Sequence, residues 1–364
     1  MAEQNGLPAT ETLNRTLNNE RTPLMDVRNL KMYFPITAGL FSKVTGYVKA
    51  ADDVSFQLYP GETLGLVGES GCGKTTVGRC LIRAYEPTAG QVLYQEAGGA
   101  QVDLAQLKRE ALQPYRTQIR MIFQDPYSSL NPRMTVFEVI SEVLRANTTM
   151  PPSEMEERVA RTLRQVGLRP EYMRRYPHAF SGGERQRIVI ARALITEPRL
   201  ILADEAVSAL DVSVRAQILN LMEDLRTRYH LTYLFVSHDL SVVRYICDRV
   251  IVMYVGKVVE IAPVDRLFQA PKHPYTEALL SSVPIDNPRQ RAAKARIRLE
   301  GEVADPSNPP SGCYFHPRCR YAQDRCRTET PPLHEVLPGH FAACHFAEEL
   351  ELIGAEQGNN NNNG

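Results

Sequence analysis

Hydrophobic and polar positions follow two different patterns along this chain. Segments such as SEMEERVARTLRQVG (153–167) and VRAQILNLMEDLRTRYH (214–230) repeat apolar residues at the three- to four-residue spacing of an amphipathic helix. Between such segments stand short apolar runs that are rich in branched side chains: TLGLV (63–67), IRMIF (119–123), LILA (200–203) and TYLFV (232–236). Strands of this kind, when helices separate them, are typical of a mainly parallel sheet covered on both faces. The pattern therefore predicts an α/β fold.

The two ends of the chain follow neither pattern. Residues 1–23 are too polar to bury enough surface to offset the entropy of ordering them, so we predict a disordered leader there. Residues 353–364 end in GNNNNNG and form a low-complexity tail. Between these ends we expect a core domain over residues 24–265 and a smaller, proline-rich extension over residues 266–352.

Composition narrows the classes of protein to consider. A chain of 364 residues with 43% hydrophobic content can bury one large core and carry a small second domain. Lys and Arg together number 42, as do Asp and Glu, so no overall positive field points to nucleic acid as a partner. The N-terminal stretch lacks the apolar core of a signal peptide, and no run reaches the roughly 18 apolar residues that span a bilayer. We therefore expect a soluble cytoplasmic protein.

The segment GESGCGKTT carries a strong chemical signal. It fits the phosphate-loop pattern G-x-x-x-x-G-K-[ST], and it lies between the predicted strand at 63–67 and a helical segment, as that pattern requires. Its glycines let the backbone curl so that amide groups bind phosphate oxygens, while the lysine reaches the β- and γ-phosphates and the first threonine ligates Mg²⁺. The residues that we expect to contact ATP here are Gly68, Ser70, Gly71, Cys72, Gly73, Lys74, Thr75 and Thr76.

Two acidic residues follow the apolar run at 200–203. Asp204 and Glu205 stand at the carboxyl end of that predicted strand, where ligands of open α/β sheets bind. There Asp204 would hold Mg²⁺ through water and Glu205 would polarise the water that attacks the phosphate. An apolar strand that ends in acids is common, so this pair alone does not establish a site.

Four further motifs accompany these two: MIFQDP (121–126), FSGGERQRIVIARAL (180–194), SALD (208–211) and FVSHDL (235–240). In this order and spacing, the whole set resembles the nucleotide-binding subunits of ATP-binding cassette (ABC) transporters. The resemblance implies that Gln124 forms the Q-loop and contributes to the Mg²⁺ site, that Asp211 belongs to the D-loop and that His238 is the switch histidine. It also assigns the signature motif to Ser181, Gly182 and Gly183.

The resemblance implies an ABC-type P-loop ATPase core with a helical signature subdomain at about residues 127–190. Two such subunits would face each other head to tail with two ATP molecules between them. The chain departs from the family pattern at Ala206, where proline is usual, and at Glu184, where glutamine is commonest. An aromatic residue before the phosphate loop usually stacks on adenine; Tyr47 is our candidate, and Phe41 competes with it.

Two longer stretches point to one branch of the family. LFQAPKHPYTEALLSSVP (267–284) and the N-terminal stretch 34–70 resemble the ATPases of oligopeptide and dipeptide importers, in particular the second of the two paired ATPase subunits. The resemblance implies a heterodimer with a homologous ATPase, two transmembrane permease subunits, an extracytoplasmic solute-binding protein, and a peripheral place on the cytoplasmic face of the plasma membrane. Other cargoes of this branch, namely nickel, oligosaccharides, glutathione and opines, stay open, as does a soluble ABC ATPase without a transport role.

Seven cysteines remain to be explained. We interpret Cys72, Cys80 and Cys247 as small buried or loop residues. The extension holds the other four at wide intervals: Cys313, Cys319, Cys326 and Cys344. Disulfides would need an oxidising compartment, and structural zinc prefers tighter pairs, although His316, His340 and His345 lie nearby. The resemblance to peptide-importer ATPases favours a 4Fe-4S cluster on the four cysteines, which we expect to act as a structural staple outside the ATP motifs.

Overall fold

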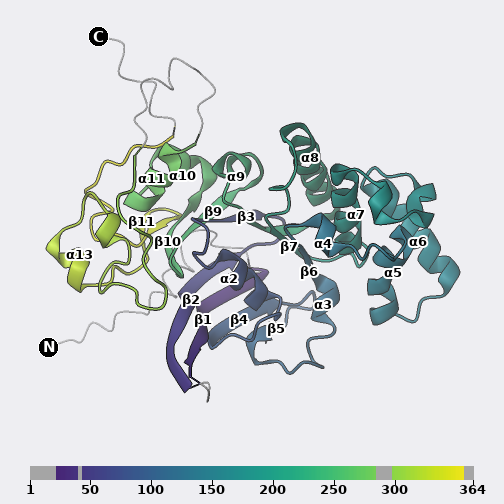
Figure 1. The fold of residues 1–364 in the computed structure, drawn as a ribbon, viewed down its shortest axis with the longest axis horizontal. Helices are drawn as coiled ribbons and strands as arrows, with labels where there is room; N and C mark the ends of the chain where they lie inside the picture. The colour runs from purple at the N-terminus through teal and green to yellow at the C-terminus, as the bar shows by residue number, and fades with distance from the viewer. Residues whose placement is uncertain (1–21, 40–42, 284–296, 356–364) are drawn as a thin grey trace, which may run out of the picture. The chain divides into compact units, whose positions relative to one another are not determined.

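A computed structural model describes residues 22–39, 43–283 and 297–355 of the chain (Figure 1). The predicted leader, apart from its last two residues, the end of the tail, and Phe41 lie outside the described residues. The chain divides into two compact units. The first unit comprises the described residues of 1–59, 64–105 and 237–364, and the second comprises residues 60–63 and 106–236.

The strands of the first unit form two groups. The antiparallel group has the order β2 (Lys43–Leu58), β1 (Met25–Ala38), β4 (Ala89–Gln95) and β5 (Gln101–Asp103). The other group has the order β11 (His334–Leu337), β12 (His340–Ala342), β10 (Lys257–Pro263), β9 (Arg249–Tyr254) and β3 (Thr63–Val67). The helices are α2 (Lys74–Leu81), α9 (Leu240–Ile246), α10 (Val264–Gln269), α11 (Pro274–Ser281), η4 (His316–Arg318) and α13 (Asp324–Thr328).

The second unit combines parallel strands with a group of helices. Its strands run in the order β8 (Thr232–Val236), β7 (Leu200–Asp204) and β6 (Ile119–Ile122), and β7 and β8 are buried along their whole length. Among its helices, α5 (Val136–Asn147), α6 (Pro152–Gln165) and α7 (Gly182–Leu194) pack against one another. The remaining helices are α3 (Tyr115–Gln118), α4 (Pro126–Ser129), η2 (Pro170–Arg174), η3 (Pro177–Ala179) and α8 (Val212–Tyr229), and η1 (Leu104–Gln106) lies where the chain passes into this unit.

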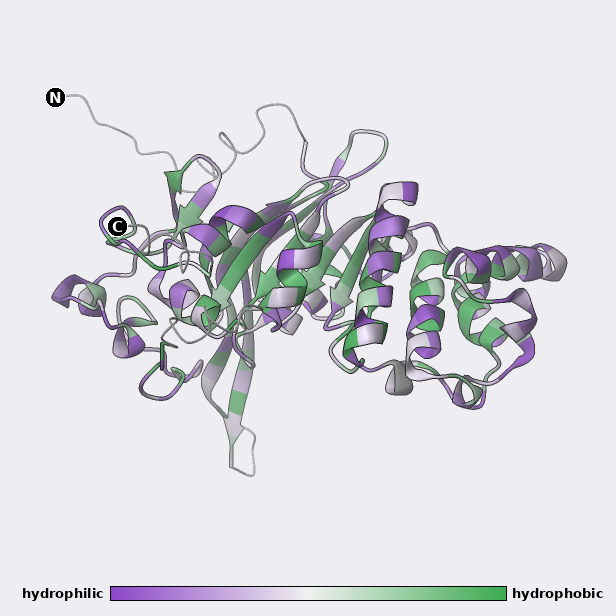
Figure 2. Cartoon of the chain, turned by 90° about the horizontal axis from the view of Figure 1, so that it is seen from above, coloured by the Kyte–Doolittle hydropathy of each residue, from purple (hydrophilic) through white to green (hydrophobic). Residues whose placement is uncertain are grey.

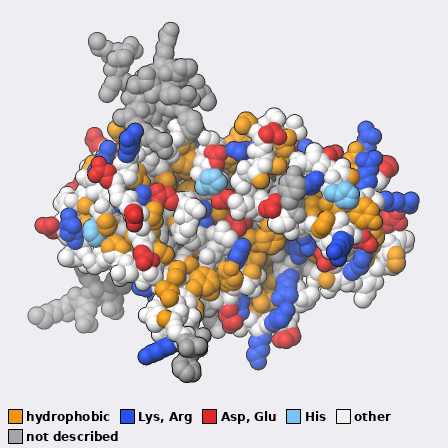
Figure 3. Space-filling view, viewed as in Figure 1, with side chains coloured by type: hydrophobic (Ala, Val, Ile, Leu, Met, Phe, Trp, Pro, Cys, Tyr) orange, Lys and Arg blue, Asp and Glu red, His pale blue; other side chains and the backbone are white. Residues whose placement is uncertain are grey.

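The predicted α/β class is confirmed, and the four apolar runs are β3, β6, β7 and β8. Parallel pairing is found for β3 with β9, β6 with β7 and β7 with β8. The expectation of a mainly parallel sheet is wrong for the first unit, because connections as short as those between β1 and β2 or between β9 and β10 allow only hairpins. Figure 2 shows apolar residues concentrated on the strands, whereas the helices carry both polar and apolar residues. Basic and acidic side chains are both scattered over the face in Figure 3, as their equal numbers suggest.

The C-terminal extension joins the first unit through its sheet. β12 pairs with β10, with Glu260 opposite Ala342, so the yellow segment in Figure 1 continues the sheet of the core. The fully buried Glu260 carboxylate accepts hydrogen bonds from the backbone N–H groups of Lys272 (2.7 Å) and His273 (3.0 Å), and its Oε1 lies 2.6 Å from His340 Nε2. One carboxylate thus connects β10, the entry to α11 and β12. The boundaries between domains and of the helical subdomain stay predictions.

The turn between β3 and α2 is held against two neighbouring backbone segments. Gly256 donates its N–H to the Cys72 carbonyl (2.9 Å) and accepts from the Asp52 N–H (2.8 Å). A Cβ on Gly73, whose φ is +104°, would stand 1.9 Å from the Ala50 carbonyl oxygen. A Cβ on Gly71, whose φ is +80°, would meet nothing within 4 Å. Glycine is therefore required at 73 for space and at both positions for conformation.

We predict that Gly73→Ala destabilises the nucleotide-free protein more than Gly71→Ala does. Both substitutions place a Cβ in a left-handed conformation, which costs about 1–2 kcal/mol and lowers the melting temperature by about 2–8 °C. Only Gly73→Ala also forces the Ala50 backbone to move, so its shift should be at least about twice as large. Thermal unfolding of the two variants without ligand measures the difference. Equal shifts would contradict the steric role of Gly73.

Candidate functional site

Lys74 lies inside the phosphate loop of the first unit. Its side chain is buried, and its Nζ donates to the carbonyl oxygens of Gly68 (2.8 Å) and Glu69 (2.9 Å). Burial raises the pKa of the nearby Cys72 thiol, so that group stays neutral beside the ammonium. The loop thus holds one positive charge at its centre. Such a charge, together with the loop amides, is suited to bind phosphate oxygens.

The other predicted site residues of the first unit lie in the loop, in α2, on β2 and just before α9. Thr75 and Thr76 belong to the first turn of α2, and Ser70 lies in the loop itself. Tyr47 lies on β2 opposite Pro35 and is 50% exposed, as an adenine-stacking side chain must be before nucleotide binds. His238 is exposed just before α9. The roles of these residues stay predictions.

The second unit brings Gln124 and Glu205 together. Gln124 Nε2 donates to Glu205 Oε2 over 2.8 Å, although the two residues are 81 positions apart. Asp204 is buried at the end of β7, whereas the Glu205 backbone turns into the left-handed region with φ of 48°. Because non-glycine residues rarely adopt this conformation, it marks a constrained position. The turn after Glu205 is closed by the Ser208 N–H, which donates to the Glu205 carbonyl (3.1 Å), so alanine at 206 leaves a hydrogen-bonded turn.

The predicted signature motif lies at the start of α7, which has a capping box. Ser181 Oγ accepts from the Glu184 N–H (3.4 Å), and the Glu184 carboxylate accepts from the Ser181 N–H (3.0 Å) and hydroxyl (2.8 Å). Hydrogen bonds from the Ser181 backbone and side chain hold the pKa of Glu184 below its usual range. Glutamate at this position therefore completes the helix start, as the more usual glutamine also could. Gly182 and Gly183 form the first helical turn, and a Cβ on Gly183 would lie 2.6 Å from Val214 Cγ1.

Asp211 begins the next helix of the second unit. Its carboxylate accepts from the Val214 N–H (2.9 Å) and the Ser213 hydroxyl (2.8 Å) at the N-terminus of α8. The backbone hydrogen bond, followed by that from Ser213, lowers the pKa of Asp211. The Asp211 carboxylate is thus ionised and fixed in place, and its D-loop role stays a prediction. The predicted ATP-site residues are therefore held in two sets, one within each unit, and the Mg²⁺ roles of Thr75, Gln124 and Asp204 stay predictions.

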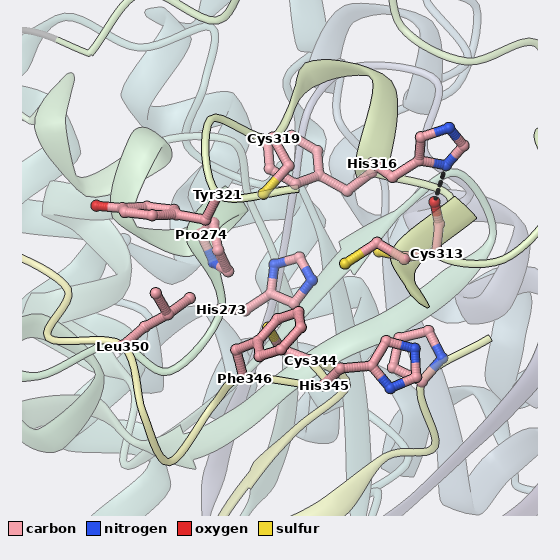
Figure 4. A pocket seen from close by; sticks show the side chains of 13 residues that line it. His273, Pro274, Cys313, His316, Cys319, Tyr321, Cys344, His345, Phe346 and Leu350 are labelled. Atoms are coloured by element: carbon pink, nitrogen blue, oxygen red, sulfur yellow. Dashed lines mark hydrogen bonds between the residues drawn. The ribbon is translucent and has the colours of Figure 1, made fainter. Parts of the chain in front are cut away.

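The four cysteines of the extension line one cavity of the first unit. Figure 4 shows Cys313, Cys319 and Cys344 around the His273 ring, and Cys326 completes the set. The Cys313 N–H donates to the Cys326 carbonyl (2.9 Å), which brings two of the widely spaced segments together. None of the seven cysteines forms a disulfide, and Cys72, Cys80 and Cys247 are buried as predicted.

The structure gives no support to a single-ion site on these cysteines. Across residues 22–39, 43–283 and 297–355, no group of three or more His, Cys, Asp or Glu side chains is arranged to hold a metal ion. His340 is bonded to Glu260, and His345 Nε2 lies 2.9 Å from the Glu329 carbonyl oxygen. The described residues therefore give no evidence for a zinc ion or for the predicted 4Fe-4S cluster on these cysteines. The four thiols nevertheless line one cavity, although they are widely spaced in the sequence.

Sequence reasoning missed the contacts between the extension and the phosphate loop. The Glu69 N–H donates to the Tyr275 hydroxyl (2.8 Å), and the Glu69 carboxylate forms an ion pair with Arg318. His273 caps α11 by accepting from the Tyr275 N–H (3.1 Å), so this segment enters the helix next to these contacts. The sequence separations of 206 and 249 residues left no local signal for either contact.

Comparison with known proteins extends these observations. A family model described as "ABC transporter" matches residues 51–208, and one described as "Oligopeptide/dipeptide transporter, C-terminal region" matches residues 259–326. "Oligopeptide transport ATP-binding protein AppF" of Bacillus subtilis (strain 168) is 52% identical over 332 residues, which cover 91% of this chain and 99% of that protein. "Dipeptide transport ATP-binding protein DppF" of Haemophilus influenzae is 49% identical, with 89% and 97% covered.

A solved structure is also similar to this chain. It is titled "Dimeric structure of a post-hydrolysis state of the ATP-binding cassette MJ0796 bound to ADP and Pi". The identity is 26% and the TM-score 0.57, with 66% of this chain and 98% of that chain covered. Identity of about one half over nearly the full length of AppF and DppF, and the match of both family models, agree with the motifs described above. The chain therefore belongs to the ATP-binding subunits of the ABC transporter family, within the oligopeptide and dipeptide transporter branch.

Proposed function

We propose that this chain binds and hydrolyses ATP to power the import of peptides through a membrane complex. The observation that carries the proposal is its 52% identity to an oligopeptide transport ATP-binding protein over 99% of that protein's length. The phosphate loop and the pair of Gln124 and Glu205 support it, because they supply groups for binding phosphate and for activating water.

Each residue set has a distinct chemical task. Lys74 and the loop amides bind the phosphates in the ground state, and Thr75 and Asp204 would hold Mg²⁺, which neutralises charge on the transferred phosphoryl group. Glu205 accepts a hydrogen bond from Gln124 that fixes one carboxylate oxygen, and its other oxygen can polarise the attacking water. Glu205 thus acts on the transition state, whereas Lys74 acts already on bound ATP.

The signature motif serves a second subunit. The start of α7 presents the amides of Gly182 and Gly183 with the positive end of a helix dipole, so it is suited to bind the γ-phosphate of a nucleotide held by the opposing subunit. ATP would then hold two subunits together, and hydrolysis would release them. Asp211 and His238 are the proposed D-loop and switch residues of this cycle.

We propose that the natural complex contains a homologous ATPase, two transmembrane permease subunits and an extracytoplasmic solute-binding protein. The two curated relatives named above are ATP-binding proteins of oligopeptide and dipeptide transport, which supports peptides as the cargo. Among the described residues, none of the helices has the length and apolarity of a membrane span. We place the chain as a peripheral subunit on the cytoplasmic face of the plasma membrane.

The assigned roles predict different defects for two substitutions. Lys74→Ala should weaken MgATP binding, whereas Glu205→Gln should bind MgATP and lower turnover by about 10²-fold or more in the assembled complex. Glu223→Gln is a matched control, because Glu223 pairs with Arg226 on α8, 2.9 Å away, and has no role in the proposed chemistry. Calorimetric titration and phosphate release measure the two steps. Wild-type turnover by Glu205→Gln would contradict the assignment.

We further propose that Cys313, Cys319, Cys326 and Cys344 hold a 4Fe-4S cluster. Four thiols line one cavity, and thiolates of a cluster bind different irons, so they do not need the common centre that a single ion demands. When bound, the cluster would cross-link the segments that carry the cysteines. Burial, with a contribution from the neighbouring cysteines, raises the pKa of Cys319 to about 11 and that of Cys344 to about 12, so iron must displace protons to bind.

Anaerobically purified full-length protein should therefore be brown, with broad absorption near ~400 nm and roughly four irons per chain. Cys326→Ser should lose iron and colour because it removes one ligand. Cys247→Ser is the control, because Cys247 is buried away from the cavity and should leave the iron content unchanged. Metal analysis and visible spectroscopy test this. Colourless protein with one zinc per chain would contradict the cluster.

The raised pKa values predict how the alkylation rate of these cysteines depends on pH in the metal-free protein. Below its pKa, a thiol gains about tenfold in thiolate fraction per pH unit, so alkylation of Cys319 by iodoacetamide should rise about 100-fold between pH 7.5 and 9.5. An ordinary thiol with a pKa of about 8.5 should level off in this range, and the same peptide in urea provides that control. Peptide mass spectrometry resolves each cysteine. A rate that is half-maximal near pH 8.5 in the folded protein would contradict the effect of burial.

A further inference from the structure

Glu69 of the phosphate loop is held by the C-terminal extension at two points. Its backbone N–H donates to the hydroxyl of Tyr275 on α11 (2.8 Å). Its carboxylate accepts from both terminal nitrogens of Arg318, with Nη1 to Oε2 at 2.8 Å and Nη2 to Oε1 at 3.2 Å. All three residues lie in the first unit. The extension therefore contacts the loop that binds phosphate, and it does not lie apart from the ATP motifs.

The ion pair is well shielded. The Arg318 side chain is 7% exposed and that of Glu69 27% exposed, and Arg318 also lies 3.5 Å from the Tyr254 hydroxyl. A two-pronged arginine–carboxylate pair in such surroundings is stronger than a surface pair, because its geometry is fixed and little water screens it.

The ion pair affects phosphate binding because it neutralises the negative charge of Glu69. Glu69 places a negative charge in the loop that must accept the polyanion ATP, and its carbonyl oxygen accepts from Lys74 Nζ (2.9 Å). Arg318 neutralises this carboxylate and engages both of its oxygens. Without Arg318, the carboxylate would repel the phosphates and compete for Lys74.

Arg318 is carried by the segment that bears two of the cavity cysteines. It ends η4, directly before Cys319, and the Cys313 carbonyl accepts from the His316 N–H (3.0 Å) at the start of the same turn. Phe315 of this turn is buried with its ring centroid 5.4 Å from that of Tyr275. A movement of the cysteine segment must therefore move the group that neutralises Glu69.

We propose that Arg318 is a positioning residue through which the four-cysteine segment sets the affinity of the phosphate loop for ATP. The inference rests on the proposed function and deepens it by naming a means of regulation. When the segment is ordered, Arg318 pairs with Glu69 and ATP binds tightly; when the segment is released, the free carboxylate lowers the affinity. By linkage, ATP and an ordered cysteine segment favour each other equally.

The test measures MgATP binding to the full chain by calorimetry. Arg318→Met should weaken binding about tenfold, and adding Glu69→Gln to it should restore most of the loss by removing the unpaired charge. Arg320→Met is the matched control: Arg320 pairs with Glu277 (2.9 Å) in the same extension without contacting the loop, so its affinity should stay within about twofold of wild type.

A cysteine substitution tests whether the cysteine segment affects ATP binding through Glu69. Cys319→Ser should weaken MgATP binding by a similar factor in the wild-type background, and by less than about twofold in the presence of Glu69→Gln. This second background keeps the test valid if Arg318→Met does not fold. A Cys319→Ser effect of equal size in both backgrounds would overturn the coupling through Glu69.

The outcomes separate the inference from the proposed function. If Arg318→Met bound MgATP like the wild type while Lys74→Ala lost binding, the inference would fail and the function would stand. An equal loss for Arg318→Met and Arg320→Met would also overturn it, because it would reflect general damage to the extension. Failure of the wild-type chain to bind MgATP would overturn both.

Discussion

The close approach of three backbone segments around the phosphate loop is the constraint on which the first unit depends. Hydrogen bonds join the middle of β2, the turn between β9 and β10, and the loop in series, because the Cys72 carbonyl accepts from Gly256 and the Gly256 carbonyl accepts from Asp52. A Cβ on Gly256 would lie 2.5 Å from the Lys49 carbonyl oxygen, which leaves no room for a side chain there. The loop geometry is thus a property of the surrounding sheets as much as of its own sequence.

The sequence predicted those strands and helices that a local pattern of residues determines. Short apolar runs identified β3, β6, β7 and β8, and the helical repeats at 153–167 and 214–230 identified α6 and α8, because both patterns depend on neighbouring residues. It did not predict the antiparallel sheet of β1 and β2, whose partly exposed residues give no clear alternation. Such a pattern does not reveal pairing between strands.

The sequence did not predict every contact between distant residues of the candidate site, and the reason is physical. The hydrogen bond between Gln124 and Glu205 joins motifs whose roles were already expected, so the fold only had to bring them together. Arg318 belongs to no motif, and Glu69 occupies a position at which the phosphate-loop pattern allows any residue. The two residues are 249 positions apart. Side-chain charge alone does not select one partner among the many acidic residues of a chain.

The pairing of β12 with β10 has a consequence for the sheet as a whole. Without β12, β10 would end the sheet with a row of unpaired backbone groups, which is a template for association with other chains. The extension covers that edge and replaces it with β11, a strand of only four residues whose shortness limits such association. During synthesis the edge stays uncovered until about residue 342 has emerged, so the nascent core is more prone to aggregate than the finished chain.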